Sequence, residues 1–298
     1  MTRLPTDSLR FTRNIGNKHK HLPFAHTISN TRLAIQPLPN TMTTLIHCYK
    51  HDRGYFDFVS STMMLAELYP QYDVTWAIPS KRILSSVLAK PQTELYRDNL
   101  DCVFHSFIVH GWEANQKGFE GFTNKLRRLG ESQSHVYCDF RYGRERGANE
   151  KYRAMLTFKP EIETAAREKI RTQFGTDYSV LHVRTGDTEL RHGKPIDLAR
   201  WVNAIQDYLF GATAPIVLVC DSISLKNQMS RQLLCTPGSP YHSGNDEGNV
   251  ESFVFDVLTI QNAKNVHTIM ANAWSGSSFS RIPAQFAGIP TTHYNILW

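Results

Sequence analysis

The chain lacks long apolar runs, paired cysteines and low-complexity tracts. Nowhere among its 298 residues do about 18 apolar residues follow one another, as a membrane-spanning helix requires, and no signal-peptide core opens the chain. Its 5 cysteines are an odd number without a CxxC pair, so they form neither a disulfide framework nor a zinc pattern. These absences predict a soluble protein with reduced thiols, as in the cytoplasm.

The composition is that of a folded protein. A hydrophobic content of 41% is enough to bury a core and excludes a disordered chain. The length allows one large domain or two of about 130–150 residues each.

Basic charge is concentrated at the start of the chain. Residues 1–41 hold six Lys and Arg side chains against one Asp, so they carry +5 of the total net charge of +6. The remaining chain is close to neutral, and a basic face for nucleic acid is therefore not expected. We expect 1–41 to be a disordered leader. An organellar targeting peptide, a start at Met42 and a nucleic-acid-binding arm are the alternatives.

Strand-like apolar runs alternate with helical patterns along the chain. In the first half the predicted strands are 44–49, 73–78, 102–109 and 135–140, with helices at 57–69 and within 111–131. In the second half the predicted strands are 178–184, 216–221 and 267–272, with helices at 160–175, 197–210, 224–234, 249–263 and 278–286. This alternation predicts parallel sheets joined by right-handed crossovers.

A break in the pattern separates the two halves. Residues 141–150, RYGRERGANE, have no apolar periodicity and are the candidate junction. We therefore predict an α/β fold with two Rossmann-like, doubly wound domains facing a cleft. The first would span 42–150 and the second 151–298.

Polar clusters follow three strands of the second half. They are Arg184-Thr185-Gly186-Asp187, Asp221-Ser222, and Ser275-Gly276-Ser277-Ser278, the last leading into a helix. The carboxyl ends of strands in a doubly wound sheet meet in one ligand-binding crevice. A helix amino terminus with serines binds phosphate oxygens, and the planar fork of an arginine pairs with two of them. The combination predicts a diphosphate site, although each part alone is also typical of a helix cap or a surface ion pair.

Three segments of the second half resemble a known family. His182-Val183-Arg184-Thr185-Gly186-Asp187 is similar to the HxRxGD signature of α1,2-, α1,6- and protein O-fucosyltransferases. Residues 217–222, a strand ending in Asp221 before a helix, together with Ser224-Leu225-Lys226 resemble their second motif. The run from Phe255-Asp256 to Ser277-Ser278-Phe279-Ser280-Arg281 resembles the third. Residues 194–197, KPID, are also similar to the segment after the first motif in the α1,6 enzymes. The resemblance covers residues 178–290.

The resemblance implies a GT-B arrangement that binds GDP-fucose in the second domain and transfers fucose, with inversion and without a metal or cofactor, to a glycan or glycoprotein hydroxyl. The residues expected at the donor are His182, Arg184, Asp221, Asp256, Ser277, Ser278 and Phe279. Arg184 would hold the β-phosphate, and Asp256 would read the guanine N1–H and N2–H₂ groups, which suits a carboxylate acceptor. The alternatives are a helix-surface acid for Asp256 and a buried strand histidine for His182.

Other residues of the motifs leave choices open. The general base is assigned to Glu189, with Asp187, Asp57 and no dedicated base as alternatives. Gly54 and Asp57 weakly resemble the glycine-rich loop that opens these enzymes on the acceptor side, and the alternative is an ordinary strand–helix turn. Thr185 replaces the second arginine of the α1,2 and α1,6 enzymes, which bears on the identity of the donor. Protein O-fucosyltransferases also lack that arginine.

Two other functions fit the same residues. One is the same fold with another nucleotide-sugar donor, and the other is a noncatalytic nucleotide- or glycan-binding protein. Secretory-pathway members of the family carry a membrane anchor or signal. Because no such segment is recognised here, we expect a bacterial, viral or otherwise cytoplasmic location, or an organellar one if the leader is a targeting peptide.

Overall fold

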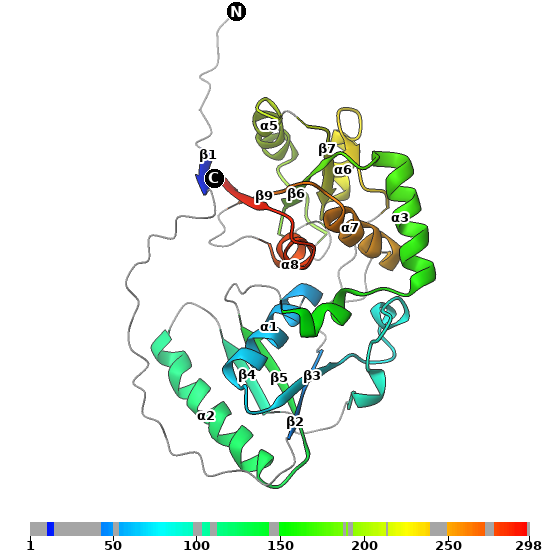
Figure 1. The fold of residues 1–298 in the computed structure, drawn as a ribbon. Coiled ribbons are helices and arrows are strands. Elements are labelled where there is room, and N and C mark those ends of the chain that lie inside the picture. Colours follow the sequence, from blue (N-terminus) through cyan, green and yellow to red (C-terminus); the bar gives the residue numbers. More distant parts are fainter. Residues whose placement is uncertain are drawn as a thin grey trace, which may run out of the picture.

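A computed structural model describes residues 11–14, 43–49, 54–97, 103–107, 112–142, 149–186, 189, 193–212, 214–238, 249–271 and 277–296. They form two α/β halves, each built on its own sheet, with helix α1 lying between them (Figure 1). Within the described residues, no helix is both long and apolar enough to cross a membrane.

The first half is built on a four-stranded sheet in the order β3-β2-β5-β4, with all neighbouring strands parallel. Its elements are β2 (Thr44–Cys48), α1 (Tyr55–Leu68), β3 (Asp73–Ala77), η1 (Ile83–Ser86), η2 (Thr93–Leu95), β4 (Val103–Phe107), α2 (Trp112–Gly130) and β5 (His135–Tyr142). Helices α1 and α2 share one face, where Leu65 and Phe122 pack in one cluster with Leu45 of β2. On the other face Ile46 packs against Leu95 of η2. In its described part this sheet therefore carries α-helices on one face.

The second half is built on a six-stranded sheet in the order β1-β10-β9-β6-β7-β8. Its strands are β6 (Ser179–Arg184), β7 (Ile216–Cys220), β8 (Leu234–Cys235), β9 (Val266–Ala271), β10 (Thr291–Ile296) and β1 (Phe11–Asn14). Neighbours are parallel except β1, which runs antiparallel to β10. The strand order reverses between β6 and β9, which is the topological switch point where such sheets bind ligands.

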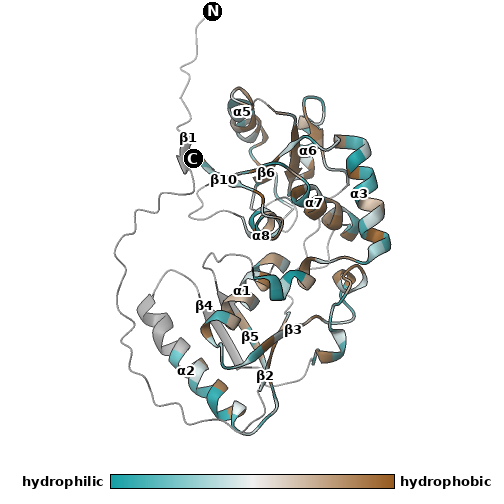
Figure 2. Ribbon diagram, viewed as in Figure 1, coloured by the Kyte–Doolittle hydropathy of each residue, from teal (hydrophilic) through white to brown (hydrophobic). Residues whose placement is uncertain are grey.

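Helices cover both faces of this second sheet. They are α3 (Pro160–Phe174), α5 (Leu198–Leu209), α6 (Ile223–Met229), α7 (Val250–Gln261) and α8 (Ser278–Phe286). Val217 and Val219 of β7 pack in the cluster that contains α7, whereas Leu218 and Cys220 pack in the cluster that contains α5 and α6. Burial on both faces explains the uninterrupted apolar sequence of β7. Helix α7 is hydrophobic along most of its length, whereas α3 is largely hydrophilic (Figure 2).

Most predicted elements are confirmed, and the differences lie near the chain ends and strand β8. Helix α6 ends at Met229, short of the predicted 234, because residues 234–235 pair with β7 as β8. Strand β10 was not predicted, because its sequence TTHYNI has no apolar run and depends on pairing with β9. Residues 11–14, inside the expected disordered leader, form β1 beside β10.

Aromatic packing joins the two halves. Phe56 of α1 stacks on Phe253 of α7, with ring centroids 5.7 Å apart, and meets Phe279 of α8 edge-on at 5.3 Å. The junction also includes η3 (Glu150–Leu156), where Tyr152 donates a hydrogen bond to the Val74 carbonyl at 3.1 Å. Residues 143–148 of the expected junction lie outside the described residues, and the predicted boundary at 150 stays a prediction. One continuous core therefore connects both halves.

Candidate functional site

The arginine of the first motif is held at the carboxyl edge of the six-stranded sheet. Arg184 ends β6, and its Nη1 lies 2.9 Å from Oδ2 of Asp221, which follows β7. The other oxygen of Asp221 accepts hydrogen bonds from the backbone N–H of Thr185 at 2.7 Å and from its hydroxyl at 2.9 Å. Asp221 is buried, while the Arg184 side chain stays 30% exposed. The carboxylate thus fixes the arginine and the turn after β6 on the edge that faces the switch point.

The amino terminus of α8 lies at the same edge, after β9. Ser277 caps this helix, and its hydroxyl accepts a hydrogen bond from the Phe279 N–H at 3.3 Å. The Ser278 hydroxyl donates to Oδ1 of Asp57 in α1 at 2.5 Å. The partial positive charge of a helix amino terminus favours an anion here, and in this structure the anion is the carboxylate of Asp57.

Asp57, predicted for the acceptor side, therefore contacts Ser278, predicted for the donor side. Gly54 caps α1, and a Cβ atom on it would lie 3.2 Å from Oδ2 of Asp57. Asp57 itself is exposed, in the first turn of α1. This contact between the two halves has no sequence signal, because it depends on how α1 and α8 pack.

His182 is an interior residue. It is 2% exposed, and its Nδ1 lies 3.0 Å from the hydroxyl of Ser280, which lies 2.8 Å from the hydroxyl of Thr268. Its ring lies 5.4 Å from that of Phe279. His182 is thus buried in β6 and contacts α8 through Ser280, as the alternative interpretation describes, and its role at the donor stays a prediction.

Glu189 lies against the amino terminus of α6. Its Oε2 accepts hydrogen bonds from the Ser222 hydroxyl at 2.5 Å and from the Ser224 N–H at 3.3 Å, and the Ser224 hydroxyl also donates to this carboxylate. Partial burial raises the pKa of Glu189, but the hydrogen bonds from Ser222 and Ser224 outweigh it, and the pKa is lowered. Its rival Asp187 lies outside the described residues.

Asp256 is buried and faces a lysine. It is 3% exposed on α7, and its Oδ2 lies 4.0 Å from Nζ of Lys226 on α6. Burial raises the pKa of Asp256, the charge of Lys226 and a hydrogen bond from Thr236 lower it, and the net shift is upward. The alternative of a helix-surface acid is therefore wrong. The sequence analysis names Lys226 within the second motif but assigns it no role at the site, because a lysine in a helix is nearly always exposed.

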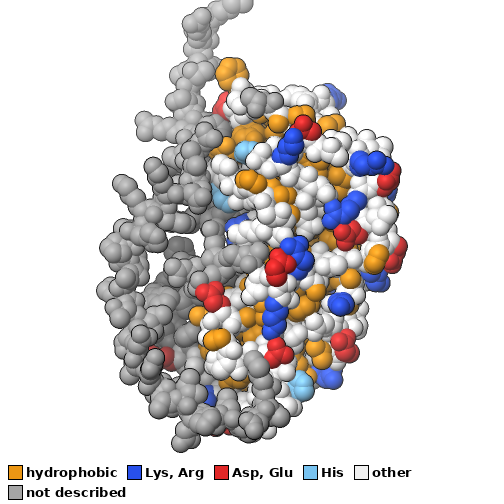
Figure 3. Space-filling view, viewed as in Figure 1, with side chains coloured by type: hydrophobic (Ala, Val, Ile, Leu, Met, Phe, Trp, Pro, Cys, Tyr) orange, Lys and Arg blue, Asp and Glu red, His pale blue; other side chains and the backbone are white. Residues whose placement is uncertain are grey.

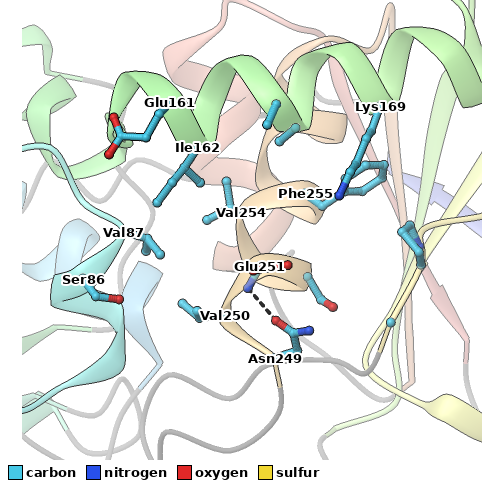
Figure 4. A pocket seen from close by; sticks show the side chains of 15 residues that line it. Ser86, Val87, Glu161, Ile162, Lys169, Asn249, Val250, Glu251, Val254 and Phe255 are labelled. Atoms are coloured by element: carbon cyan, nitrogen blue, oxygen red, sulfur yellow. Dashed lines mark hydrogen bonds between the residues drawn. The ribbon is translucent and has the colours of Figure 1, made fainter.

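A pocket of about 590 Å³ lies between α7 and α3 (Figure 4). Val87 after η1 contributes from the first half, and Ile162 and Val254 line the space between the helices. Asn249 caps α7 at its rim, accepting from the Glu251 N–H at 2.8 Å. The pocket contains none of the predicted site residues.

On the face shown in Figure 3, basic and acidic side chains of the described residues are interspersed. Among the residues that the structure describes, there is no group of three His, Cys, Asp or Glu side chains that could hold a metal ion.

Comparison with known proteins gives similarity at the level of structure. No family model matches the chain, and no curated protein sequence matches it. The structure of NodZ alpha-1,6-fucosyltransferase soaked with GDP-fucose is similar with a TM-score of 0.50 and 14% identity, over 82% of this chain and 92% of that one. A mutant of Arabidopsis thaliana FUT1 in complex with GDP gives a TM-score of 0.47 and 10% identity, over 85% of this chain and 70% of that one. Apo POFUT1 gives 0.42 and 10%, over 87% and 99%.

The similarity to NodZ defines the class of fold. At 14% identity it shows the fold alone, which agrees with the predicted GT-B-like class, while the two domains facing a cleft stay a prediction. The predicted α/β class with parallel sheets is confirmed. The site within this fold is the polar edge formed by Arg184, Asp221 and the amino terminus of α8.

Proposed function

We propose that this protein is an inverting, metal-independent glycosyltransferase that moves fucose from GDP-fucose to a glycan hydroxyl. The observation that carries the proposal is the placement of Arg184 by Asp221 at the switch point, in the sequence register of the fucosyltransferase motif. The fold shared with NodZ, whose structure was soaked with GDP-fucose, supports it.

The donor diphosphate would bind between Arg184 and α8. The guanidinium supplies a fixed positive charge and planar donors, and the amino terminus of α8 supplies backbone N–H groups and the Ser278 hydroxyl. Ser278 would exchange its present acceptor, Asp57, for a phosphate oxygen. As the bond between sugar C1 and the β-phosphate oxygen breaks, these groups stabilise the negative charge that develops on GDP.

Two carboxylates compete for the role of general base, and we favour Asp57 over Glu189. Glu189 already accepts three hydrogen bonds from Ser222 and Ser224, and its lowered pKa makes it a weaker proton acceptor. Asp57 is exposed and comes from the first half, opposite the donor side. In this mechanism the acceptor oxygen attacks C1, its proton passes to Asp57 and GDP leaves.

The proposal is tested by titrating GDP, UDP and ADP into the protein by calorimetry and then assaying GDP-fucose turnover. GDP should bind best, and Arg184→Ala should weaken its binding and reduce turnover by roughly 10²–10³-fold. Arg171→Ala is the matched control, because Arg171 is exposed on α3 and pairs with Glu168. Preferred binding of UDP or ADP would favour the same fold with another donor, and binding without turnover would favour a noncatalytic protein.

A further inference from the structure

The pair formed by Lys226 and Asp256 is incomplete as a structural ion pair. Lys226 is 5% exposed and Asp256 is 3% exposed, and their nearest charged atoms are 4.0 Å apart. Among the described residues, neither Nζ of Lys226 nor Oδ1 of Asp256 has a hydrogen-bond partner. Buried charges are costly unless hydrogen bonds satisfy them. Within the described residues, the buried Lys226 ammonium therefore lacks a hydrogen-bond acceptor, and the buried Oδ1 atom of Asp256 lacks a donor.

The pair lies at the edge that carries the candidate donor site. Helices α6 and α7 pack on opposite faces of the six-stranded sheet, so their side chains can meet only beyond the ends or the edge of the strands. Lys226 lies one turn into α6, and its N–H donates to the carbonyl of the cap, Ser222, at 3.1 Å. Ser222 directly follows Asp221, which holds Arg184. A nucleotide with its phosphates at Arg184 would extend its base over β7 and β8 toward this pair.

We propose that Lys226 is a specificity-determining residue of the donor site, where its ammonium recognises guanine beside Asp256, the residue that the family resemblance assigns to the base. The inference rests on the proposed use of a GDP-linked donor. Asp256 accepts from the guanine N1–H and N2–H₂ groups, and the ammonium of Lys226 donates to the neighbouring O6. Adenine carries an amino group in place of O6 and would present a donor to the ammonium.

Lys226 has a second effect on this site, because its charge keeps the neighbouring carboxylate ionised. Burial raises the pKa of Asp256, and Lys226 is the first of the groups that oppose this rise. Among the described residues, the other titratable groups facing the pair are two thiols, Cys220 of β7, which is buried next to Asp221, and Cys235 of β8, which is half-buried. Burial raises the pKa of both thiols. Without Lys226, Asp256 would take up a proton at a higher pH. Since a protonated carboxyl cannot accept from both guanine groups, GDP binding would then become dependent on pH.

The test is calorimetric titration of the full chain with GDP, IDP and ADP at several pH values. IDP lacks the N2 amino group, so the wild-type protein should bind GDP best, IDP less well and ADP least. Lys226→Met should lower GDP affinity about tenfold, reduce the preference for GDP over ADP, and make GDP binding fall as the pH is lowered. Lys226→Arg should restore part of the preference. Lys264→Met is the matched control, because Lys264 is exposed and pairs with Asp177.

A further variant covers the case in which Lys226→Met does not fold. The combined change Lys226→Met and Asp256→Asn leaves no buried charge unpaired, and it should bind GDP, IDP and ADP with nearly equal affinity. If the wild-type protein prefers GDP but Lys226→Met, or this combined variant, keeps that preference and its affinity, the inference is wrong while the proposed function stands. If the wild-type protein does not prefer GDP, both are overturned.

Discussion

The six-stranded half places Arg184, Asp221 and Ser277 at the ends of neighbouring strands, whereas the four-stranded half reaches the same edge through α1, where Asp57 accepts a hydrogen bond from Ser278. The first set follows from strand topology, because the carboxyl ends of parallel strands share one edge. The second contact follows from how α1 packs against α7 and α8 through Phe56. The proposed donor side is thus determined within one sheet, and the proposed acceptor side depends on the junction of the two halves.

The largest effect is expected at Asp57, the residue of the first half that is proposed to act as the general base. Asp57→Asn removes the proton acceptor and should lower kcat by roughly 10²–10⁴-fold, with GDP affinity nearly unchanged. Glu189→Gln should lower kcat far less. Steady-state turnover of GDP-fucose, together with calorimetry, measures both. Full activity of Asp57→Asn with loss of activity in Glu189→Gln would reverse the assignment of the base.

Packing at the junction is expected to matter next. Phe253→Ala removes a ring that is 2% exposed and contacts Phe56 at 5.7 Å and Phe279 at 6.1 Å. The free energy of unfolding should fall by about 3–5 kcal/mol. Urea unfolding measures the loss, with Phe210→Ala as the control, since Phe210 is 97% exposed. Equal stability of the two variants would show that the aromatic junction contributes nothing.

A smaller effect is expected at the turn between β8 and α7. Gly238 has φ 75°, and a Cβ on it would lie 2.2 Å from the hydroxyl oxygen of Ser252. Gly238→Ala combines backbone strain with a steric clash and should lower stability by about 1–3 kcal/mol. Gly193→Ala is a matched control for the backbone strain alone, because Gly193 also has a positive φ and a Cβ atom on it would have no neighbour within 4 Å. If both variants lose the same stability, the approach to Ser252 is irrelevant.

The smallest effect is expected at Glu189, which acts within the second half. Its folded-state pKa is lowered, so its contribution to stability is present above the unfolded pKa and is lost as the pH falls through the folded pKa. Because the side chain is only partly buried and solvent screens it, Glu189→Gln should cost only about 0–1 kcal/mol at neutral pH and nothing in strong acid. Unfolding curves at both pH values measure this difference. A cost that grows in acid would contradict the assigned hydrogen bonds.

The comparison of the two halves also shows which structural features the sequence could predict. The helix from Pro160 to the left-handed Gly175, and the apolar strand β7, follow from local signals and were predicted. The contact of Arg184 with Asp221 follows from two predicted strand ends in one sheet. Strand β10 was missed, because its polar residues become a strand only by pairing with β9.

Two features of the site required the tertiary structure. The contact of Ser278 with Asp57 joins residues from different halves, and no sequence pattern fixes how these halves pack. The approach of Lys226 to Asp256 joins helices on opposite faces of a sheet. Helical periodicity would place that lysine in solvent.

In the proposed function, Arg184 and the end of β6 hold the diphosphate of a guanine nucleotide. The most direct measurement is calorimetric titration of GDP, UDP and ADP into the wild-type protein and into Arg184→Ala. We expect GDP to bind most tightly to the wild-type protein and Arg184→Ala to lose most of this affinity. Equal affinity for the three nucleotides, or GDP binding that is unchanged in Arg184→Ala, would contradict the proposed function.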